Sequence, residues 1–288
     1  MIPSAFEYHA PTSLADAIAL LGRFGDEAKL LAGGHSLLPM MKLRFATPGH
    51  LIDLARVPDL RGIAHVGNEI HIGAMTTEAD IVGSPLLAEK VPLLVEGARA
   101  IADPQVRYRG TVGGDLSHGD PGNDHPALML ALGASFVLRG PGGERVVAAI
   151  DFFHGLYDTE LQPGEVMTRI HVPIPPAGTG WAYEKLKRKI GDFATAGSAV
   201  LLQMDGARVA SASIALTNVA ATPLKAVAAE AALVGRVLDE GSLTDATRLA
   251  MEICDPVADQ RGDAAYKRAM AGEMTRRALQ KAHARAIA

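Results

Sequence analysis

The chain has 288 residues, a formal net charge of −4 and a pI near 6.2. This length is enough for two domains of ordinary size, and the acidic balance argues against nucleic acid or an anionic membrane as the partner. With 48% hydrophobic and 21% charged residues, the composition is that of a globular protein with a sizeable core.

We expect neither a signal peptide nor a membrane-spanning helix. The first nine residues contain no basic region and no apolar run, so we expect no signal peptide. No stretch approaches the roughly 20 apolar residues that a membrane-spanning helix needs. We therefore expect a cytoplasmic protein, or one held at the inner face of the cell membrane through a partner.

Cys254 is the single cysteine. One cysteine cannot form a disulfide within the chain, and it cannot supply an iron–sulfur cluster or a zinc site of cysteines. We expect Cys254 to be a small core residue on a helix. No metal is predicted in this chain, and metal chemistry is expected to belong to another one.

The first 55 residues alternate short apolar strands with helices. Thr12 and Ser13 are candidate caps for the first helix, and Gly25 ends it. The pattern predicts a β-α-β-α-β unit with strands at 6–8, 29–31 and 51–54 and helices at 14–24 and 37–43.

A glycine motif lies between the second strand and the second helix of this unit. It reads Ala32, Gly33, Gly34, His35 and Ser36. Glycine allows a turn at positive φ and brings backbone N–H groups close to a ligand. Ser36 can cap the helix that follows, and the free N–H groups at a helix start favour an anion. The motif is a plausible phosphate cradle, although such a turn without a ligand is the commoner occurrence.

A second motif of the same kind follows about 80 residues later. It reads Thr111, Val112, Gly113, Gly114 and Asp115. A run rich in turn formers follows at 116–124 and leads into a predicted apolar helix at 126–132. Two such loops could hold one elongated ligand, for which a diphosphate with a large apolar ring is the natural candidate. Neither motif matches the dinucleotide fingerprint G-x-G-x-x-G, so a Rossmann site is not indicated.

Residues 56–176, which contain the second motif, form the second predicted unit. We expect strands at 60–63 and 69–73 around a turn at 67–68, helices from 76 and from 92 to 102, a hairpin at 134–148 and a strand at 166–173.

The proline-rich stretch 173–180 is the clearest boundary, because proline blocks both helix and central strand. Beyond it we expect three strands at 180–187, 196–204 and 209–216, with a hairpin turn at 205–206. Alanine-rich helices are predicted at 223–238, 243–254 and 264–286. The pattern indicates an α+β domain with a three-stranded antiparallel sheet and a helical bundle on one face. The predicted domains are 1–55, 56–176 and 177–288.

The two glycine motifs resemble the flavin loops of the FAD subunits of molybdenum hydroxylases. This family includes xanthine dehydrogenase and carbon monoxide dehydrogenase. The resemblance extends through 121–124 and the run 183–196, which begins Tyr-Glu-Lys-Leu-Lys-Arg-Lys, and covers essentially the whole chain. Among the branches of the family, the FAD-carrying chains of aerobic carbon monoxide dehydrogenases are the most similar.

The resemblance implies a fold and a set of cofactor contacts. The fold is a two-lobed FAD-binding domain of the vanillyl-alcohol oxidase type, followed by an α+β C-terminal domain that closes over the flavin ring. Both glycine motifs would bind the diphosphate and ribityl groups. Asp124 would hold a hydroxyl, Ile101 and Phe193 would face the two sides of the flavin, Met167 would make a backbone contact, and Lys185 would supply a basic contact.

Asp115 departs from the family, which usually has Asn or Ser at this position. A carboxylate beside a diphosphate is disfavoured by Coulomb repulsion. The side chain is expected either to point away, so that only the N–H is used, or to bind a hydroxyl.

Several residues keep two interpretations. His118 and His125 could be metal ligands, but no third partner stands at a fixed spacing, so no metal is predicted there. The basic runs at 107–109 and 185–189 suit a solvated face, a diphosphate contact or a docking surface for an acidic partner. Phe193 suits a core position as well as a flavin shield.

For function, the resemblance implies an electron-transfer subunit. A large partner with a molybdenum cofactor would oxidise the substrate, most simply CO with water to CO2, and a small partner with iron–sulfur clusters would relay electrons. FAD in this chain would pass them to a quinone or another acceptor. We expect a dimer of heterotrimers. The alternatives are a xanthine, aromatic or aldehyde hydroxylase subunit of the same family, and a stand-alone flavin oxidoreductase.

Overall fold

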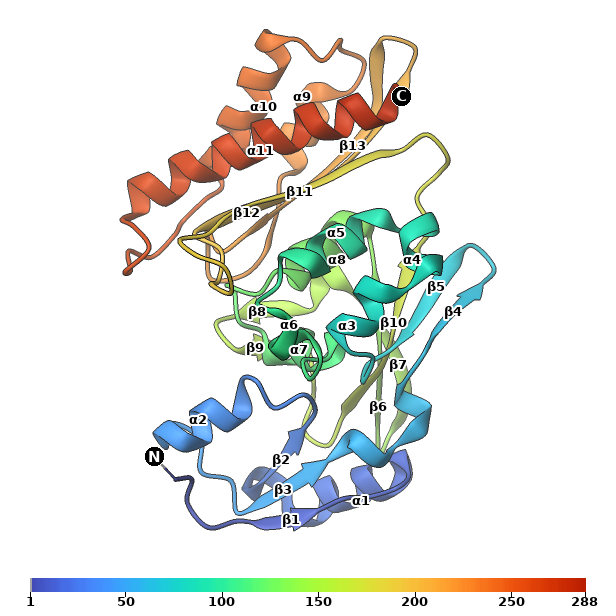
Figure 1. Cartoon of the computed structure of the whole chain (residues 1–288), viewed down its shortest axis with the longest axis vertical. Helices are drawn as coiled ribbons and strands as arrows, with labels where there is room; N and C mark the ends of the chain where they lie inside the picture. The colour runs from blue at the N-terminus through green and yellow to red at the C-terminus, as the bar shows by residue number, and fades with distance from the viewer. Residues whose placement is uncertain (1) are drawn as a thin grey trace.

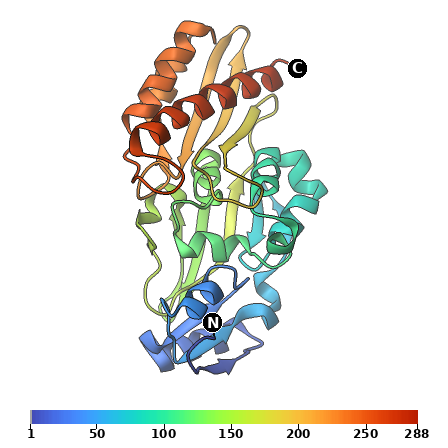
Figure 2. The same cartoon turned by 60° about the vertical axis from the view of Figure 1, so that its left-hand side comes forward.

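The computed structural model describes residues 2–288. The three larger of its four sheets follow one another along the long axis of the molecule (Figure 1). The turned view shows the N-terminal segment at one end, the middle segment between, and the C-terminal helices at the other end (Figure 2). No helix among residues 2–288 is long and apolar enough to cross a membrane.

The N-terminal segment forms the predicted β-α-β-α-β unit. Its three strands make a parallel sheet in the order β1-β3-β2. Ser13 caps the first helix by accepting the Asp16 N–H at 3.1 Å, as expected. The elements are β1 (Glu7–His9), α1 (Leu14–Phe24), β2 (Ala28–Leu31), α2 (Leu37–Leu43) and β3 (His50–Asp53).

The middle segment is built on a five-stranded antiparallel sheet in the order β4-β5-β10-β6-β7. Its strands are β4 (Ile63–Val66), β5 (Glu69–Gly73), β6 (Ser135–Gly140), β7 (Gly143–Ala148) and β10 (Val166–Pro173), with a small pair of β8 (Phe153–Gly155) and β9 (Asp158–Thr159). Its helices are α3 (Glu78–Gly83), α4 (Pro85–Lys90), α5 (Pro92–Ala100), α6 (Pro104–Arg107), α7 (Val112–His118) and α8 (His125–Leu132).

The strand predicted at 60–63 was misplaced. Leu60 lies fully buried at the end of a short 3-10 turn, and β4 begins only at Ile63. Pro58 at the start of this turn explains the shift, because its fixed φ suits the first position of a helical turn.

The C-terminal segment carries a four-stranded antiparallel sheet rather than the predicted three strands. The added strand β14 (Leu224–Lys225) pairs with β13 (Arg208–Thr217) at the edge, beyond β12 (Ala196–Asp205) and β11 (Gly180–Leu186). It replaces the start of the helix predicted from 223, since Pro223 allows an extended segment there. The helices that follow are α9 (Val227–Leu233), α10 (Glu240–Glu252) and α11 (Ala264–Ala286).

Helices cover both faces of this last sheet, not one as predicted. Helix α11 packs on β11 and β12 from outside, while α5 and α8 of the middle segment pack on the other face. Glu96 of α5 ties the layers together: it accepts the Tyr183 N–H at 2.9 Å and pairs with Arg285 of α11 at 2.7 Å. Cys254 is buried in the C-terminal core, as predicted, but it lies just after the end of α10 and not on a helix.

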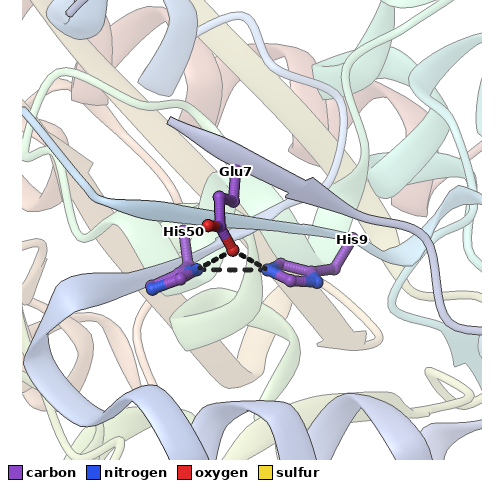
Figure 3. A group of neighbouring side chains, drawn as sticks. All are labelled: Glu7, His9 and His50. Carbon is purple, nitrogen blue, oxygen red and sulfur yellow. Dashed lines mark hydrogen bonds and ion pairs between the residues drawn. The ribbon is translucent and has the colours of Figure 1, made fainter. Parts of the chain in front are cut away.

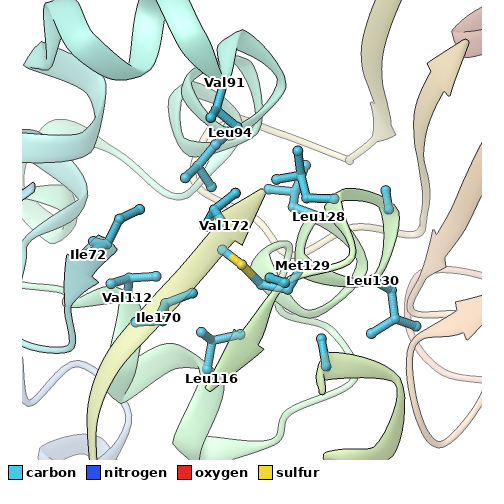
Figure 4. Packing of buried hydrophobic residues seen from close by; sticks show 14 of the residues in the cluster. Ile72, Val91, Leu94, Val112, Leu116, Leu128, Met129, Leu130, Ile170 and Val172 are labelled. Carbon is cyan, nitrogen blue, oxygen red and sulfur yellow. The ribbon is translucent and has the colours of Figure 1, made fainter. Parts of the chain in front are cut away.

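Helix α8 is the centre of the largest core (Figure 4). All eight of its residues are buried, because it lies between the five-stranded sheet on one side and β12 and β13 on the other. Leu128 shows no exposed surface and packs directly over Gly97 of α5, where a Cβ would stand 2.2 Å from it. The core thus holds α5, α8 and both sheets in one packing unit.

We predict that Leu128→Ala lowers the free energy of unfolding by about 2–5 kcal/mol, since it leaves a cavity at this crossing. Urea unfolding followed by circular dichroism measures the loss. Val146→Ala, on the exposed side of β7, is the control and should change little. Equal losses for the two variants would contradict this account of the core.

Candidate cofactor site

A cavity of about 1020 Å³ lies where the three segments meet. The first glycine motif and α2 form one wall, and the start of α7 with Ile101 and Ala102 forms another. The segment 161–167 and residues of the C-terminal segment, Lys185 and 191–193, complete it. Of the fifteen predicted site residues, all but Val112 line this cavity.

The first motif presents a row of unused donors. Within residues 2–288, the backbone N–H groups of residues 33–37 donate no hydrogen bond, and Ser36 makes no capping bond at the start of α2. Backbone N–H groups at such a turn usually find a partner, because leaving them unpaired in a partly buried place is costly. The motif therefore has the unpaired donors that an anion would need.

Two glycines explain why this turn can form. Gly34 has φ +82°, a conformation that a side chain disfavours. At Gly33 a Cβ would stand 2.3 Å from the Arg109 carbonyl oxygen, so only glycine lets the two motifs approach this closely. The turn at 33–34 is therefore also the place where the N-terminal segment contacts the middle segment near Arg109.

The second motif differs from the first and is not a loop. Thr111 caps α7 by accepting the Gly114 N–H at 3.3 Å, and the glycines lie in the first turn of the helix. Val112 is fully buried in the core, with its N–H donated to the Thr76 carbonyl, so it gives the cavity no group. Gly113 donates to the Ala74 carbonyl at 2.9 Å. The N–H groups of residues 112–114 are therefore already paired, and the glycines of this motif line the cavity without offering it donors.

Asp115 anchors a buried polar cluster behind that wall. Its N–H donates to the Thr111 carbonyl at 3.0 Å, and its Oδ2 is buried without a hydrogen-bond partner among the described residues. The N–H is therefore not free for a ligand, which leaves the carboxyl side chain as the group that can reach one. Burial raises the pKa of Asp115 to about 8, so that the carboxyl is largely neutral at neutral pH.

His125 and Glu78 form the charged part of the cluster. The His125 Nε2 and the Glu78 Oε2 lie 2.7 Å apart, and both side chains are almost fully buried. Burial alone would lower the pKa of His125, but Glu78 and the two nearby aspartates outweigh it and raise the pKa to about 9. His125 thus belongs to a buried ion pair, while His118 lies against the Tyr157 ring.

Asp124 joins the middle segment to the C-terminal one. It accepts a hydrogen bond from the Tyr183 hydroxyl and another from the Lys185 Nζ at 2.7 Å, and all three side chains are buried. Lys185 also donates to the Ala100 carbonyl at 3.3 Å. The sequence predicted Asp124 and Lys185 as separate cofactor contacts. In the structure they form an ion pair with each other, and both line the cavity.

Phe193 lies on a loop that the C-terminal segment extends over the cavity. Asp192 holds the loop: it accepts from Arg188 and Arg261 at 2.8 Å each, and these bonds lower its pKa to about 2. Phe193 remains 47% exposed, with the Arg261 guanidinium 5.7 Å from its ring centre. A half-exposed aromatic ring at a cavity is better suited to cover a flavin ring than to fill the hydrophobic core.

Two contributors escaped prediction. Ala102 lines the cavity beside Ile101. Its φ of +44° is a strained backbone conformation for alanine, and such strain often marks a functional turn. No local signal announces it, because alanine is not a turn residue. The segment 161–166 also lines the cavity; its Pro163 and Gly164 mark a turn, but nothing in them indicates a ligand.

The cavity suits FAD in shape and chemistry. The unpaired N–H row of the first motif fits a diphosphate, the buried polar edge of Asp115, Asp124 and Lys185 fits hydroxyl groups, and Ile101 and Phe193 offer apolar surfaces to a ring. These features are the ones that a site for an elongated flavin nucleotide would need.

Comparison with known proteins places the chain in a family. Residues 4–175 match the FAD binding domain in molybdopterin dehydrogenase, and residues 181–282 match the CO dehydrogenase flavoprotein C-terminal domain. The chain belongs to the FAD-binding family of the molybdopterin dehydrogenases, and FAD is its cofactor. The predicted α+β fold and its order of domains are confirmed, with the fourth strand as the correction.

Individual relatives are similar over their whole length. The carbon monoxide dehydrogenase medium chain of Hydrogenophaga pseudoflava is 57% identical over 285 residues, 99% of each chain. A solved carbon monoxide dehydrogenase from that organism, which lacks the Mo-pyranopterin moiety of its molybdenum cofactor, matches with a TM-score of 0.98 over 99% of each chain at 60% identity. Quinoline 2-oxidoreductase from Pseudomonas putida 86 matches with a TM-score of 0.94 over 99% and 100% of the two chains, at 37% identity.

We predict that Gly33→Ala abolishes tight FAD binding, because the added methyl group would collide with the Arg109 carbonyl and separate the two motifs. Titration of the chain with FAD, followed by flavin fluorescence, measures the effect. Gly83→Ala is the matched control, since a Cβ there meets nothing within 4 Å. Normal binding by Gly33→Ala would show that the contact between the motifs is dispensable.

We predict that the free energy of unfolding falls as the pH rises from about 6.5 to about 9. Asp115 and His125 have folded pKa values of about 8 and about 9, above the ordinary 3.8 and 6.5, so the folded chain binds their protons more tightly. That stability is complete below the unfolded pKa of each group and is lost as the pH passes the folded one. Urea unfolding across this range measures it.

Asp115→Asn should flatten this pH dependence, because an amide resembles the neutral carboxyl and does not titrate. His65→Gln, a change at an exposed residue of β4, should keep the dependence of the parent chain. A parent chain whose stability rises over this range would contradict the assignment.

Proposed function

We propose that this chain is the FAD-carrying medium subunit of an aerobic carbon monoxide dehydrogenase. The observation that carries the proposal is the 57% identity to such a medium chain over 99% of both proteins, against 37% for the quinoline enzyme. The substrate would be oxidised on a large molybdenum subunit, CO and water giving CO2, and a small iron–sulfur subunit would relay the electrons.

In this role FAD, when bound, supplies the redox chemistry and exchanges electrons with the partner clusters and the acceptor. The chain's own residues bind, orient and shield it. The N–H groups of residues 33–37 would hold the diphosphate, and the paired Asp124 and Lys185 would hold a hydroxyl and keep a charge beside it. Asp115, neutral at neutral pH, could offer a proton to a further hydroxyl without repelling the phosphates.

The remaining predicted contacts belong to this proposal too. Ile101 and Phe193 would lie on the two sides of the flavin ring, and Met167 would contact it through its backbone. Their positions around one cavity support this arrangement. The domain limits 1–55, 56–176 and 177–288 are likewise proposed, with support from one sheet in each part.

We further propose a quinone as the acceptor and a dimer of heterotrimers as the assembly. Both proposals rest on the resemblance of the chain to carbon monoxide dehydrogenase medium chains. A quinone acceptor would place the complex in the cytoplasm, at the inner face of the membrane.

The test is an anaerobic absorption spectrum of the complex purified through this chain. We expect one large and one small partner, flavin and iron–sulfur bands, and bleaching of both bands by CO. The isolated chain loaded with FAD should not bleach, since it carries no molybdenum centre. The reduced complex should then be reoxidised by a soluble quinone but not by NAD⁺.

Other outcomes discriminate between the alternatives. A complex bleached by quinoline or xanthine but not by CO would keep the family and reject the substrate. A yellow monomer that oxidises a small organic donor without partners would reject the subunit role and favour a stand-alone flavin oxidoreductase.

A further inference from the structure

Three potential metal ligands gather on the N-terminal sheet, outside both glycine motifs (Figure 3). Glu7 and His9 lie on β1, and His50 lies on β3. In the parallel register Glu7 is paired with His50. Since alternate residues of a strand point to the same face, His9 joins them there. The fold brings together residues that are 41 positions apart.

The distances between the three ligand atoms suit a single ion. The His9 Nε2 lies 3.2 Å from the His50 Nδ1, and the Glu7 Oε2 lies 3.4 Å from the His50 Nδ1 and 3.9 Å from the His9 Nε2. A tetrahedral ion with bonds of about 2.0–2.2 Å to nitrogen and oxygen separates its ligands by about 3.3–3.6 Å. The three atoms already stand near the corners of such a site.

The imidazole rings are held in these orientations before any ion binds. Phe24 of α1 stacks on His50 with ring centres 3.7 Å apart and planes 12° apart, and it also stacks on His9 at 5.0 Å. The histidine side chains are 22% and 15% exposed, whereas Glu7 is 72% exposed. Two sheltered nitrogens and one exposed carboxylate leave a fourth position open to water.

A second trio provides a contrast within the same molecule. Glu69, His71 and His171 also lie close together, on β5 and β10. Here the two imidazoles stack face to face, 3.8 Å apart and 9° from parallel. Nitrogen lone pairs lie in the ring plane, so those of two stacked, nearly parallel rings lie in two separate planes and do not converge on one ion. This trio is therefore a natural control.

We propose that Glu7, His9 and His50 bind a zinc ion that joins β1 to β3. A mixed nitrogen and oxygen set suits zinc. The ion takes a lone pair from both facing nitrogens, so the proton between them moves to the outer nitrogen of its ring, and both imidazoles remain neutral.

The position suggests what the ion does. Strand β1 has three residues and lies at the edge of a small sheet, over a core of a few buried side chains. Small cores of this kind gain most from a structural metal. The same sheet carries β2 and the first glycine motif, so the ion would stabilise the support of one wall of the cofactor cavity.

The test is a calorimetric titration of the full chain, without a histidine tag, with zinc chloride near neutral pH. We expect one equivalent to bind. Glu7→Gln and His9→Gln should each weaken binding by at least about tenfold, since even loss of an outer partner costs about 10- to 100-fold. Glu7→Gln alters an exposed side chain, and circular dichroism checks that His9→Gln still folds. X-ray absorption at the zinc edge should show two imidazoles.

The matched control is His71→Gln, which should bind zinc as the parent chain does. The proposal fails if the parent chain binds no zinc, if Glu7→Gln and His9→Gln bind it unchanged, or if His71→Gln is the variant that loses it. None of these results depends on FAD or on CO, so the zinc proposal stands or falls separately from the proposed function.

Discussion

The contact between the two glycine motifs is the constraint on which the cofactor site depends. Gly33 lies against the carbonyl of Arg109, and a Cβ on Gly114 would stand 3.2 Å from that of Ala32. This contact joins the N-terminal sheet to the start of α7. Residues 33–37 line the cavity, and their N–H groups have no partner among residues 2–288. The first motif supplies the unpaired N–H groups, and the close contact with the start of α7 fixes their position.

The buried polar layer behind α7 links that contact to the rest of the molecule. Glu78 of α3 pairs with His125 at the start of α8, and the next residue back, Asp124, holds Tyr183 and Lys185 of β11. Buried charges are costly unless they are paired, so the Glu78–His125 pair fixes α3 against α8 within the middle segment, and the bonds of Asp124 specify how the middle and C-terminal segments meet. The same residues that close the core therefore also form the polar edge of the cavity.

Much of this could be predicted from the sequence, and the failures have physical reasons. Periodicity and capping residues located the N-terminal unit and α11, because both are local signals. The Thr-Val-Gly-Gly-Asp motif was predicted as a loop, since glycine is a poor helix former, but Thr111 caps a helix whose glycines pack closely on Ala74 and Ala32. Here tertiary packing outweighs propensity.

The partnerships within the site could not be predicted in this way. Asp124 and Lys185 are 61 residues apart, and only the fold shows that they pair. The same holds for Glu78 with His125 and for His9 with His50, whose sequence spacing resembles no known ligand motif. Ala102 could not be predicted from the sequence either. Its strained backbone arises from the turn between α5 and α6, and alanine is not a residue type that indicates such a turn.

The most direct test of the central claim is hydrogen exchange of the backbone amides, measured by mass spectrometry with and without FAD. The claim is that one FAD molecule binds the unpaired N–H groups of residues 33–37 under the loop that carries Phe193. We predict slower exchange in both segments when FAD is bound and no change in α10, which lies in the outer layer. Unchanged exchange at residues 33–37 in a chain saturated with FAD would contradict the account.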